Sequence, residues 1–198
     1  MAAEIASGAS HLPTGEELDR MSAPEFVEAV APLFEGAPRF LGRLAAARPF
    51  GSAEALFGRA RTIAAAMPPD EQIELIDAHP RLGAPPASVS ARSFVEQGYD
   101  RDAAAARHAS DEAEEAERQR VGAELDRLNA AYEARFGFRY CVFVAGRPRA
   151  ALIPGMETAL GAEREDEVRR ALDAIVDIAA DRWATAPAGG TAGRTDRP

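Results

Sequence analysis

Two short stretches of the sequence contain side chains suited to acid/base chemistry. In the first, the imidazole of His79 directly precedes Pro80. In the second, Ser93, Glu96 and Gln97 place a hydroxyl, a carboxylate and an amide at positions i, i+3 and i+4. Side chains at this spacing project from one face of a helix, so the three would share one wall of a pocket. A histidine next to such a wall indicates an acid/base site that needs no cofactor.

The position of His79 allows two interpretations. Proline disfavours the α conformation at the residue before it, so His79 is expected at or just past the end of a helix. The helix end favours the imidazolium, whereas burial beside Leu75 and Leu82 favours the neutral ring, and the pKa could lie near neutrality. The structural alternative is that the ring only bonds a carbonyl of the last helical turn.

The second stretch also has a structural alternative. Ser-x-x-Glu is the pattern of a capping box, in which Ser93 and Glu96 would satisfy the free N–H groups at a helix start. Gln97 is not explained by that alternative. A hydroxyl, a carboxylate and an amide together can instead hold a small substrate rich in hydrogen-bonding groups.

Metal and cofactor chemistry are not indicated. The other two histidines, His11 and His108, give no metal-ligand spacing with His79. The sequence has no Gly-x-Gly-x-x-Gly, Walker or Gly-x-Ser-x-Gly motif. A single cysteine, Cys141, excludes an internal disulfide and fits a reducing compartment. We therefore expect a site with no metal and no organic cofactor.

Composition and charge exclude several classes of partner. The chain has 198 residues, of which 46% are hydrophobic, and a net charge of −9. A strongly acidic chain is not attracted to phosphate backbones or anionic lipid, so nucleic acid is not an expected partner. No apolar run approaches the roughly 20 residues of a membrane span, and the N-terminus lacks the basic and apolar regions of a secretory signal. The expected location is the cytoplasm.

Hydrophobic spacing predicts an all-α fold, a single-domain helical bundle. The exception is a run of aromatic and β-branched residues without helical spacing, which indicates one short extended segment near 138–144. The first residues, 1–17, are expected to be a flexible tail and the last, 184–198, a disordered one, which leaves a domain at 18–183. Helices are expected near 22–36, 38–47, 52–67, 70–79, 101–135 and 163–183.

The charged stretch 111–127 offers a non-enzymatic alternative. Its many Glu/Arg pairs are typical of a solvated helix face and contribute a few tenths of a kcal/mol each. If the chain were instead a helical interaction module, this stretch would be its contact surface, and replacing His79 would have no effect.

At the level of motifs, the chain resembles the 2-oxo-4-hydroxy-4-carboxy-5-ureidoimidazoline (OHCU) decarboxylases of urate degradation. The resemblance extends from about residue 18 to 182. The motifs that carry it are Ala78-His79-Pro80 with Leu82, then Ser93-x-x-Glu96-Gln97, then Leu128-Asn129-x-x-Tyr132-x-x-x-Phe136-Gly137-Phe138.

The resemblance implies an all-helical, usually dimeric enzyme without cofactor or metal that releases CO₂ from a small anionic ureidoimidazoline and forms (S)-allantoin. His79 would be the proton donor and acceptor, and Glu96 would orient it and raise its basicity. Substrate binding would fall to Pro80, Ser93, Gln97, Ala145, Gly146, Arg147 and Arg149.

Two departures from the family pattern lie close together. Arg139 follows Phe-Gly-Phe where the family usually has proline, and Ala145 aligns with an arginine of the substrate loop. An always-charged, bidentate anion binder is thus missing at 145, and Arg147 and Arg149 are the candidates to replace it. The alternative is a divergent relative that acts on another small carboxylated substrate.

Overall fold

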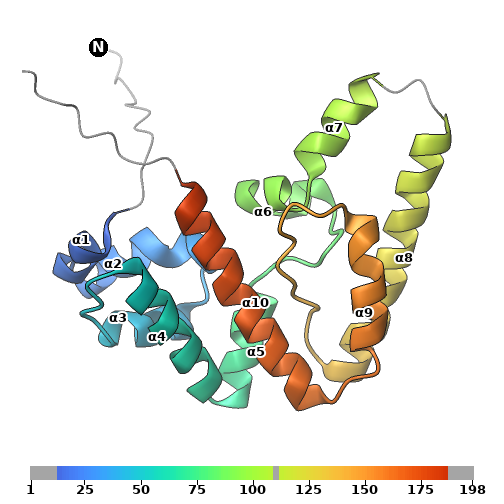
Figure 1. Cartoon of the computed structure of the whole chain (residues 1–198). Helices are drawn as coiled ribbons and strands as arrows, with labels where there is room; N and C mark the ends of the chain where they lie inside the picture. The colour runs from blue at the N-terminus through green and yellow to red at the C-terminus, as the bar shows by residue number, and fades with distance from the viewer. Residues whose placement is uncertain (1–12, 109–111, 187–198) are drawn as a thin grey trace, which may run out of the picture.

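The computed structural model describes residues 13–108 and 112–186, and in these ranges the chain is helical without a β-strand. The all-α expectation is confirmed. Figure 1 shows the last helix, α10, running diagonally through the middle of the molecule, with α1 to α4 on one side and α6 to α9 on the other. The helices are α1 (Gly15–Arg20), α2 (Ala23–Val30), α3 (Pro38–Ala46), α4 (Ala53–Ala66), α5 (Pro69–Asp77), α6 (Ala91–Glu96), α7 (Tyr99–His108), α8 (Glu112–Phe136), α9 (Ile153–Ala159) and α10 (Arg164–Thr185), with 3-10 turns η1 (Ala31–Leu33), η2 (Pro86–Ser88) and η3 (Arg149–Leu152).

Side-chain caps define the starts of the N-terminal helices. Ser22 and Glu25 form the capping box expected for α2, and Ser52 caps α4. A second capping box, between Thr14 and Glu17, starts α1 at Gly15. Ordered helix therefore begins inside the stretch 1–17 that the composition assigned to a tail, because the Thr-x-x-Glu pattern satisfies the free N–H groups there. The remainder of both expected tails, 1–12 and 187–198, lies outside the described residues.

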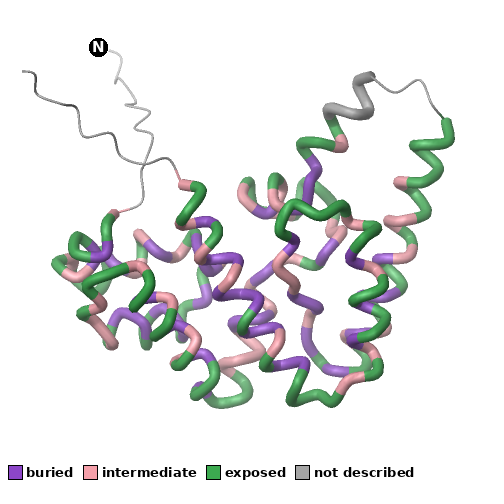
Figure 2. The backbone as a smooth tube through the Cα atoms, viewed as in Figure 1, coloured by how far each residue is buried: buried purple, intermediate pink, exposed green. Residues whose placement is uncertain are grey.

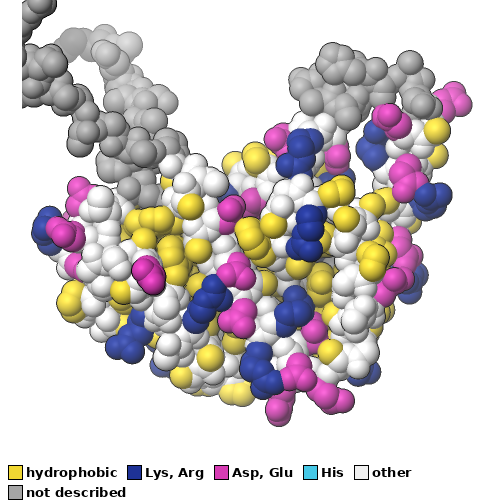
Figure 3. All heavy atoms as spheres, viewed as in Figure 1, with side chains coloured by type: hydrophobic (Ala, Val, Ile, Leu, Met, Phe, Trp, Pro, Cys, Tyr) yellow, Lys and Arg dark blue, Asp and Glu magenta, His cyan; other side chains and the backbone are white. Residues whose placement is uncertain are grey.

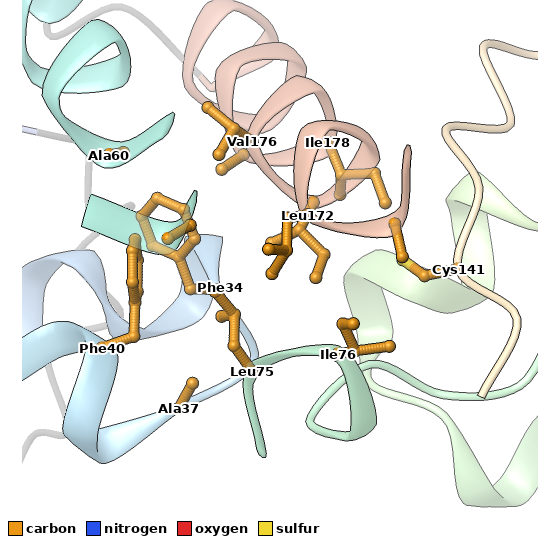
Figure 4. Close-up of a cluster of buried hydrophobic side chains, with 14 of the residues drawn as sticks. Phe34, Ala37, Phe40, Ala60, Leu75, Ile76, Cys141, Leu172, Val176 and Ile178 are labelled. Carbon is orange, nitrogen blue, oxygen red and sulfur yellow. The ribbon is translucent and has the colours of Figure 1, made fainter. Parts of the chain in front are cut away.

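The hydrophobic core is built around α10. This helix packs on α4, α5 and η1, which brings the two ends of the chain together. Figure 4 shows Leu172, Val176 and Ile178 of α10 in one cluster with Leu75 and Ile76 of α5 and with the rings of Phe34 and Phe40. All of these side chains are buried. Since α5 ends two residues before His79, the core fixes the position of the turn that carries the histidine.

The segment after α8 is irregular and extended, as the sequence predicted, and is not paired as a strand. Its aromatic side chains Phe138 and Tyr140 pack on Tyr132 of α8, with ring centroids 5.6 and 5.1 Å from it. Arg170 of α10 donates a hydrogen bond of 2.8 Å to the Cys141 carbonyl. Aromatic packing on one side and α10 on the other therefore hold this segment in place without a sheet.

Helices α7 and α8 extend away from the core, and Figure 2 shows the outer part of α8 largely exposed. In the described part of 111–127, arginines pair with glutamates of the same helix, as Arg118 does with Glu115 at 2.8 Å. Figure 3 shows Lys/Arg and Asp/Glu side chains scattered over this face of the molecule without a large patch of one sign. No described helix combines the length and the apolar character needed to cross a bilayer.

Candidate active site

A cavity of about 650 Å³ opens between α6, α10, the turn after α5 and the extended segment. Its lining includes seven of the nine site residues expected from the sequence, although these come from three separate parts of the chain. They are His79, Pro80, Ser93, Glu96, Gln97, Ala145 and Gly146.

His79 is almost completely buried, with 4% of its surface exposed. Its Nδ1 lies 3.4 Å from the Leu75 carbonyl oxygen in the last turn of α5. A carbonyl can only accept a hydrogen bond, so the Nδ1 of His79 carries the proton and its Nε2 holds a lone pair. Nε2 is buried and has no hydrogen-bond partner in the described part of the chain. The capping contact considered from the sequence is present, and it leaves the second nitrogen free for chemistry.

The environment of His79 keeps the ring neutral. Burial lowers the pKa of His79 to about 4, and the positive charge of Arg182 acts in the same direction. The charge of Glu35 and the hydrogen bond to Leu75 oppose the shift and are outweighed. At neutral pH, His79 is therefore a proton acceptor before substrate binds. The near-neutral pKa of His79 that was expected from the sequence is too high.

Two buried amides hold the turn that carries His79. Gln97 accepts a hydrogen bond from the Gly83 N–H at 2.8 Å and donates one to the Arg81 carbonyl at 3.1 Å. Asn129 of α8 donates to the Leu82 carbonyl at 2.9 Å. Gly83 has φ of +81°, and a Cβ there would lie 3.0 Å from Leu125, so the turn requires glycine. These contacts explain why Gln97 and Asn129 are needed even before a substrate binds.

Arg139 braces the same turn from the extended segment. Its Nη1 donates to the carbonyl oxygens of Asp77 at 2.7 Å and of His79 at 3.1 Å, and its backbone N–H donates to the Asp77 carboxylate at 2.9 Å. The departure from the family pattern at this position thus supplies a side chain that ties the end of α5 to the cavity wall.

Ser93 does not cap α6, because that helix begins earlier than the capping-box alternative requires. Ser90 is the N-cap, and its hydroxyl accepts a hydrogen bond from the Ser93 N–H at 3.2 Å. Ser93 is therefore an interior residue of the helix, and its hydroxyl donates to Glu35 at 2.8 Å. Gln97 caps the other end of α6. The i, i+3, i+4 spacing does place Ser93, Glu96 and Gln97 along the cavity.

The centre of the site is Arg182 of α10, a residue that the motifs did not indicate. Its side chain is 2% exposed, and every N–H of the guanidinium has an acceptor. Nε and Nη2 donate to the two carboxylate oxygens of Glu96 at 2.5 and 2.7 Å. Nη2 also donates to Glu35 at 2.7 Å, and Nη1 donates to the carbonyls of Pro32 and Leu33. Arg182 thereby joins α10, α6 and η1.

Glu35 is the second unexpected member of this cluster. Burial by itself would raise the pKa of Glu35, but the charge of Arg182 and the hydrogen bond from Ser93 outweigh it, so the pKa is lowered. Glu35 and Glu96 thus face one guanidinium. The charged groups that act on the pKa of His79 are Arg182 and Glu35, whereas both oxygens of Glu96 are bonded to Arg182. That Glu96 orients His79 stays a prediction.

A sequence signal for Arg182 exists in its spacing. It follows Ile175 by seven residues and Ile178 by four, so it continues the buried stripe of α10. A charged residue on an apolar stripe is a sign of a buried partner. No comparable signal marks Glu35, which follows η1 with φ of +52° and is brought to the site by tertiary packing alone.

Arg147 and Arg149 are not among the residues that line the cavity. Arg147 donates back to the carbonyls of Val144 and Phe143 in its own loop. Arg149 stacks on the Tyr99 ring, with its Cζ 4.3 Å from the ring centroid, and pairs with Asp102. Both arginines stabilise the loop that carries Ala145 and Gly146.

The other groups that could react at the cavity are a thiol and metal-ligating side chains. Burial raises the pKa of the Cys141 thiol to about 12, so this cavity residue is not a thiolate at neutral pH. Within the described ranges, no group of three or more His, Cys, Asp or Glu side chains is placed to hold a metal ion.

The OHCU decarboxylase family matches residues 19–184 of this sequence, which includes every residue of the site. The chain belongs to the OHCU decarboxylase family. A relative named 2-oxo-4-hydroxy-4-carboxy-5-ureidoimidazoline decarboxylase, from Haloferax volcanii, is 29% identical over 174 residues, which are 88% of this chain and 96% of the relative. The uric acid degradation bifunctional protein PucL of Bacillus subtilis is 30% identical over 86% of this chain, which spans 32% of that longer protein.

Solved structures of OHCU decarboxylase-like proteins share the fold. One is an OHCU decarboxylase crystallised in the presence of (S)-allantoin, with a TM-score of 0.56, 19% identity and coverage of 78% of this chain and 93% of that one. Another is an (S)-allantoin synthase, with a TM-score of 0.58, 18% identity and coverage of 87% of this chain and 53% of that one.

Proposed function

We propose that this protein decarboxylates 2-oxo-4-hydroxy-4-carboxy-5-ureidoimidazoline to (S)-allantoin, and that it does so without a metal or an organic cofactor. The observation that carries the proposal is the buried, unpartnered Nε2 of His79 at the cavity, in a chain that matches the family over 19–184. A neutral imidazole in an enclosed site is a suitable general base at neutral pH.

In the proposed reaction, the bond between the ring carbon and the carboxylate breaks, and CO₂ leaves. The bonding electron pair passes into the ring, where one proton from water neutralises it. The hydroxyl on the same carbon becomes a carbonyl by giving its proton to Nε2 of His79. The imidazolium returns this proton to the neighbouring ring carbon, which becomes the stereocentre. Because the proton arrives from one face, one enantiomer forms.

The surrounding residues support this role of His79 in two ways. The hydrogen bond to Leu75 keeps the proton on Nδ1, so that Nε2 is the basic atom. The negative charge of Glu35 favours the imidazolium that exists during the transfer. This charge therefore raises the pKa of His79 towards that of the enol that the imidazolium must protonate. Gln97, Asn129 and Arg139 hold the turn, and an exact position of the donor is worth several kcal/mol in such reactions.

The experiment supplies freshly generated substrate and follows the circular dichroism of allantoin. We expect the wild-type protein to accelerate decay and to give the S enantiomer, and His79→Ala to lower kcat by about 10²- to 10⁴-fold, the usual contribution of a general acid/base. Thermal unfolding of the variant serves as the control for folding. A wild-type rate equal to spontaneous decay, or an unchanged rate in His79→Ala, contradicts the proposal.

A divergent substrate is the second candidate, and Ala145 is the observation that favours it, because the loop presents only a methyl group to the cavity. Stabilisation by allantoin supports the first function, and indifference to allantoin together with stabilisation by other small carboxylates supports the second. We also propose a cytoplasmic location, as the sequence predicts, and a homodimer, as the resemblance implies. Light scattering at several concentrations would test the dimer.

A further inference from the structure

The floor of the cavity is the buried cluster of Arg182, Glu96 and Glu35, of which Arg182 and Glu96 line the cavity and Glu35 contacts Arg182. This floor has the wrong charge for an anion. Arg182 carries one positive charge, while Glu35 and Glu96, which it contacts, carry two negative charges. His79 is neutral in the empty site because its pKa is about 4. All five N–H groups of Arg182 are already bonded to protein. This cluster therefore has a formal charge of −1 and no free donor for a carboxylate.

Two other arginines line the cavity, and neither forms an ion pair with a carboxylate of the described residues. Arg92 of α6 and Arg101 of α7 have no ion pair or side-chain hydrogen bond within the described part of the chain. Each of the arginines already discussed, Arg147 and Arg149 included, donates to a carboxylate or a carbonyl. The remaining cavity carboxylate, Asp181, is exposed and makes no ion pair within the same ranges.

Arg101 lies against the backbone that connects α6 and α7. The guanidinium of Arg101 lies against Gly98, where a Cβ would come within 2.7 Å of Nη2. Gly98 has φ of +79°, which favours glycine, whereas the guanidinium is the end of a flexible side chain and can move away from a Cβ. Gly98 directly follows Gln97, which holds the His79 turn. The Arg101 cation thus lies next to Gln97, and both residues line the cavity.

We propose that Arg92 and Arg101 form the anion-binding entrance of this cavity and bind the carboxylate that the substrate loses. The inference rests on the proposed function, since it concerns the carboxylate of that substrate. The negative floor repels the carboxylate, the two arginines attract it, and the reacting ring is thereby turned towards Nε2 of His79 with CO₂ leaving towards the entrance.

This arrangement has a kinetic consequence. An arginine holds a carboxylate most strongly before the reaction, because the negative charge disappears as CO₂ forms. Removing such a contact weakens substrate binding without removing stabilisation of the transition state. We therefore expect R92A/R101A to raise KM about tenfold or more, the usual loss for a charge-assisted hydrogen bond, with kcat unchanged or higher. The KM of the single variant R101K should lie between that of the wild type and that of R92A/R101A.

A matched control comes from α8. The double variant R120A/R127A removes two exposed arginines that pair with Glu117 and Glu124 of their own helix and do not line the cavity. It changes the net charge by two units, as R92A/R101A does, so both variants alter any general attraction of the acidic protein for an anion equally. We expect the KM of this control to stay within twofold of wild type. An unchanged KM in R92A/R101A, or an equal rise in the control, overturns the inference.

A binding experiment separates this inference from the proposed reaction. The probes are allantoin, which is uncharged, and allantoate, a ureide with a carboxylate, titrated into each protein by calorimetry. R92A/R101A should weaken allantoate binding about tenfold and leave allantoin binding unchanged; equal effects on both ligands overturn the inference. A wild-type protein that is inactive but binds allantoate through these arginines overturns only the proposed reaction. One that is inactive and binds neither ureide overturns both.

Discussion

At the scale of single residues, the proposed reaction depends on one nitrogen atom of His79. The same ring that caps the last turn of α5 through Nδ1 presents Nε2 without a partner. A buried polar atom without a hydrogen bond is costly, typically by about 1–3 kcal/mol, and is therefore rare unless it serves a function. The structural and the catalytic interpretations of His79 are thus not exclusive, because each concerns a different nitrogen.

The lowered pKa of His79 leads to a prediction about stability and pH. The unfolded chain binds a proton near pH 6.5, whereas the folded chain resists protonation until about pH 4. Stability from this group is therefore complete above pH 6.5 and is lost as the pH falls towards 4. We expect a loss of about 2 kcal/mol between pH 7 and 5, measured by urea unfolding.

The control for that prediction is His79→Gln, which cannot titrate in this range. Its unfolding free energy should change less between pH 7 and 5 than that of the wild type, even if it is lower throughout. Glu35 does not affect the comparison. Its pKa is lowered in the folded protein, so the stability that it contributes is lost only as the pH falls below its ordinary pKa of 4.5. Identical pH dependence in the two proteins would exclude a depressed pKa at His79.

At the scale of helices, α10 is the element on which the site depends. It contributes Val176 and Ile178 to the core and Arg182 to the cavity, and it contacts both the N-terminal helices and the extended segment. Figure 1 shows it between the two halves of the molecule. The guanidinium of Arg182 bonds both Glu96 of α6 and the carbonyls of η1, so this one side chain connects the three elements at the cavity.

We predict that Arg182→Met lowers stability by about 3–5 kcal/mol at pH 7, because it leaves Glu35 and Glu96 in a largely buried site without a counter-charge. Chemical denaturation measures the loss. Adding Glu35→Gln and Glu96→Gln to Arg182→Met should recover part of it, since the repulsion between the carboxylates is removed. A neutral effect of Arg182→Met would mean that water enters and solvates both carboxylates.

At the scale of the whole molecule, the protein combines a core that holds the site with an arm that extends from it. The arm consists of α7 and α8, and the charged stretch of α8 pairs mostly with itself, as Arg127 does with Glu124. Exposed pairs of this kind add little stability. The arm contributes to the site through its inner ends, where Arg101 and Asn129 lie.

This organisation predicts that reversing the charge pair Glu117 and Arg120, by Glu117→Arg with Arg120→Glu, changes the unfolding free energy by less than about 0.5 kcal/mol and leaves kcat unchanged. The measurements are urea unfolding and the allantoin assay. If this variant instead abolished binding to another protein while His79→Ala had no effect on any property, the interaction-module alternative would be correct.

Local sequence signals were enough to establish the class of fold and to single out His79 as the candidate reactive group. Caps, prolines and apolar spacing are local signals, and they located α2 to α5, α10 and the turn at His79 because helix ends are decided by neighbouring residues, whereas α1 and α9 were not predicted. The extended segment was also predicted, since its aromatic residues have no helical spacing. The spacing of Ser93, Glu96 and Gln97 correctly put all three on the cavity wall, although Ser90 and not Ser93 caps the helix.

Only the tertiary structure decided the electrostatics of the site. Glu35 and Arg182 are 147 residues apart, and no local pattern links them. Their meeting depends on the way α10 crosses η1 and α6, and this crossing makes the floor negative and contributes to the low pKa of His79. Burial and long-range charge are properties of the packed molecule, so the sequence could name His79 as the candidate reactive residue but could not predict its protonation state.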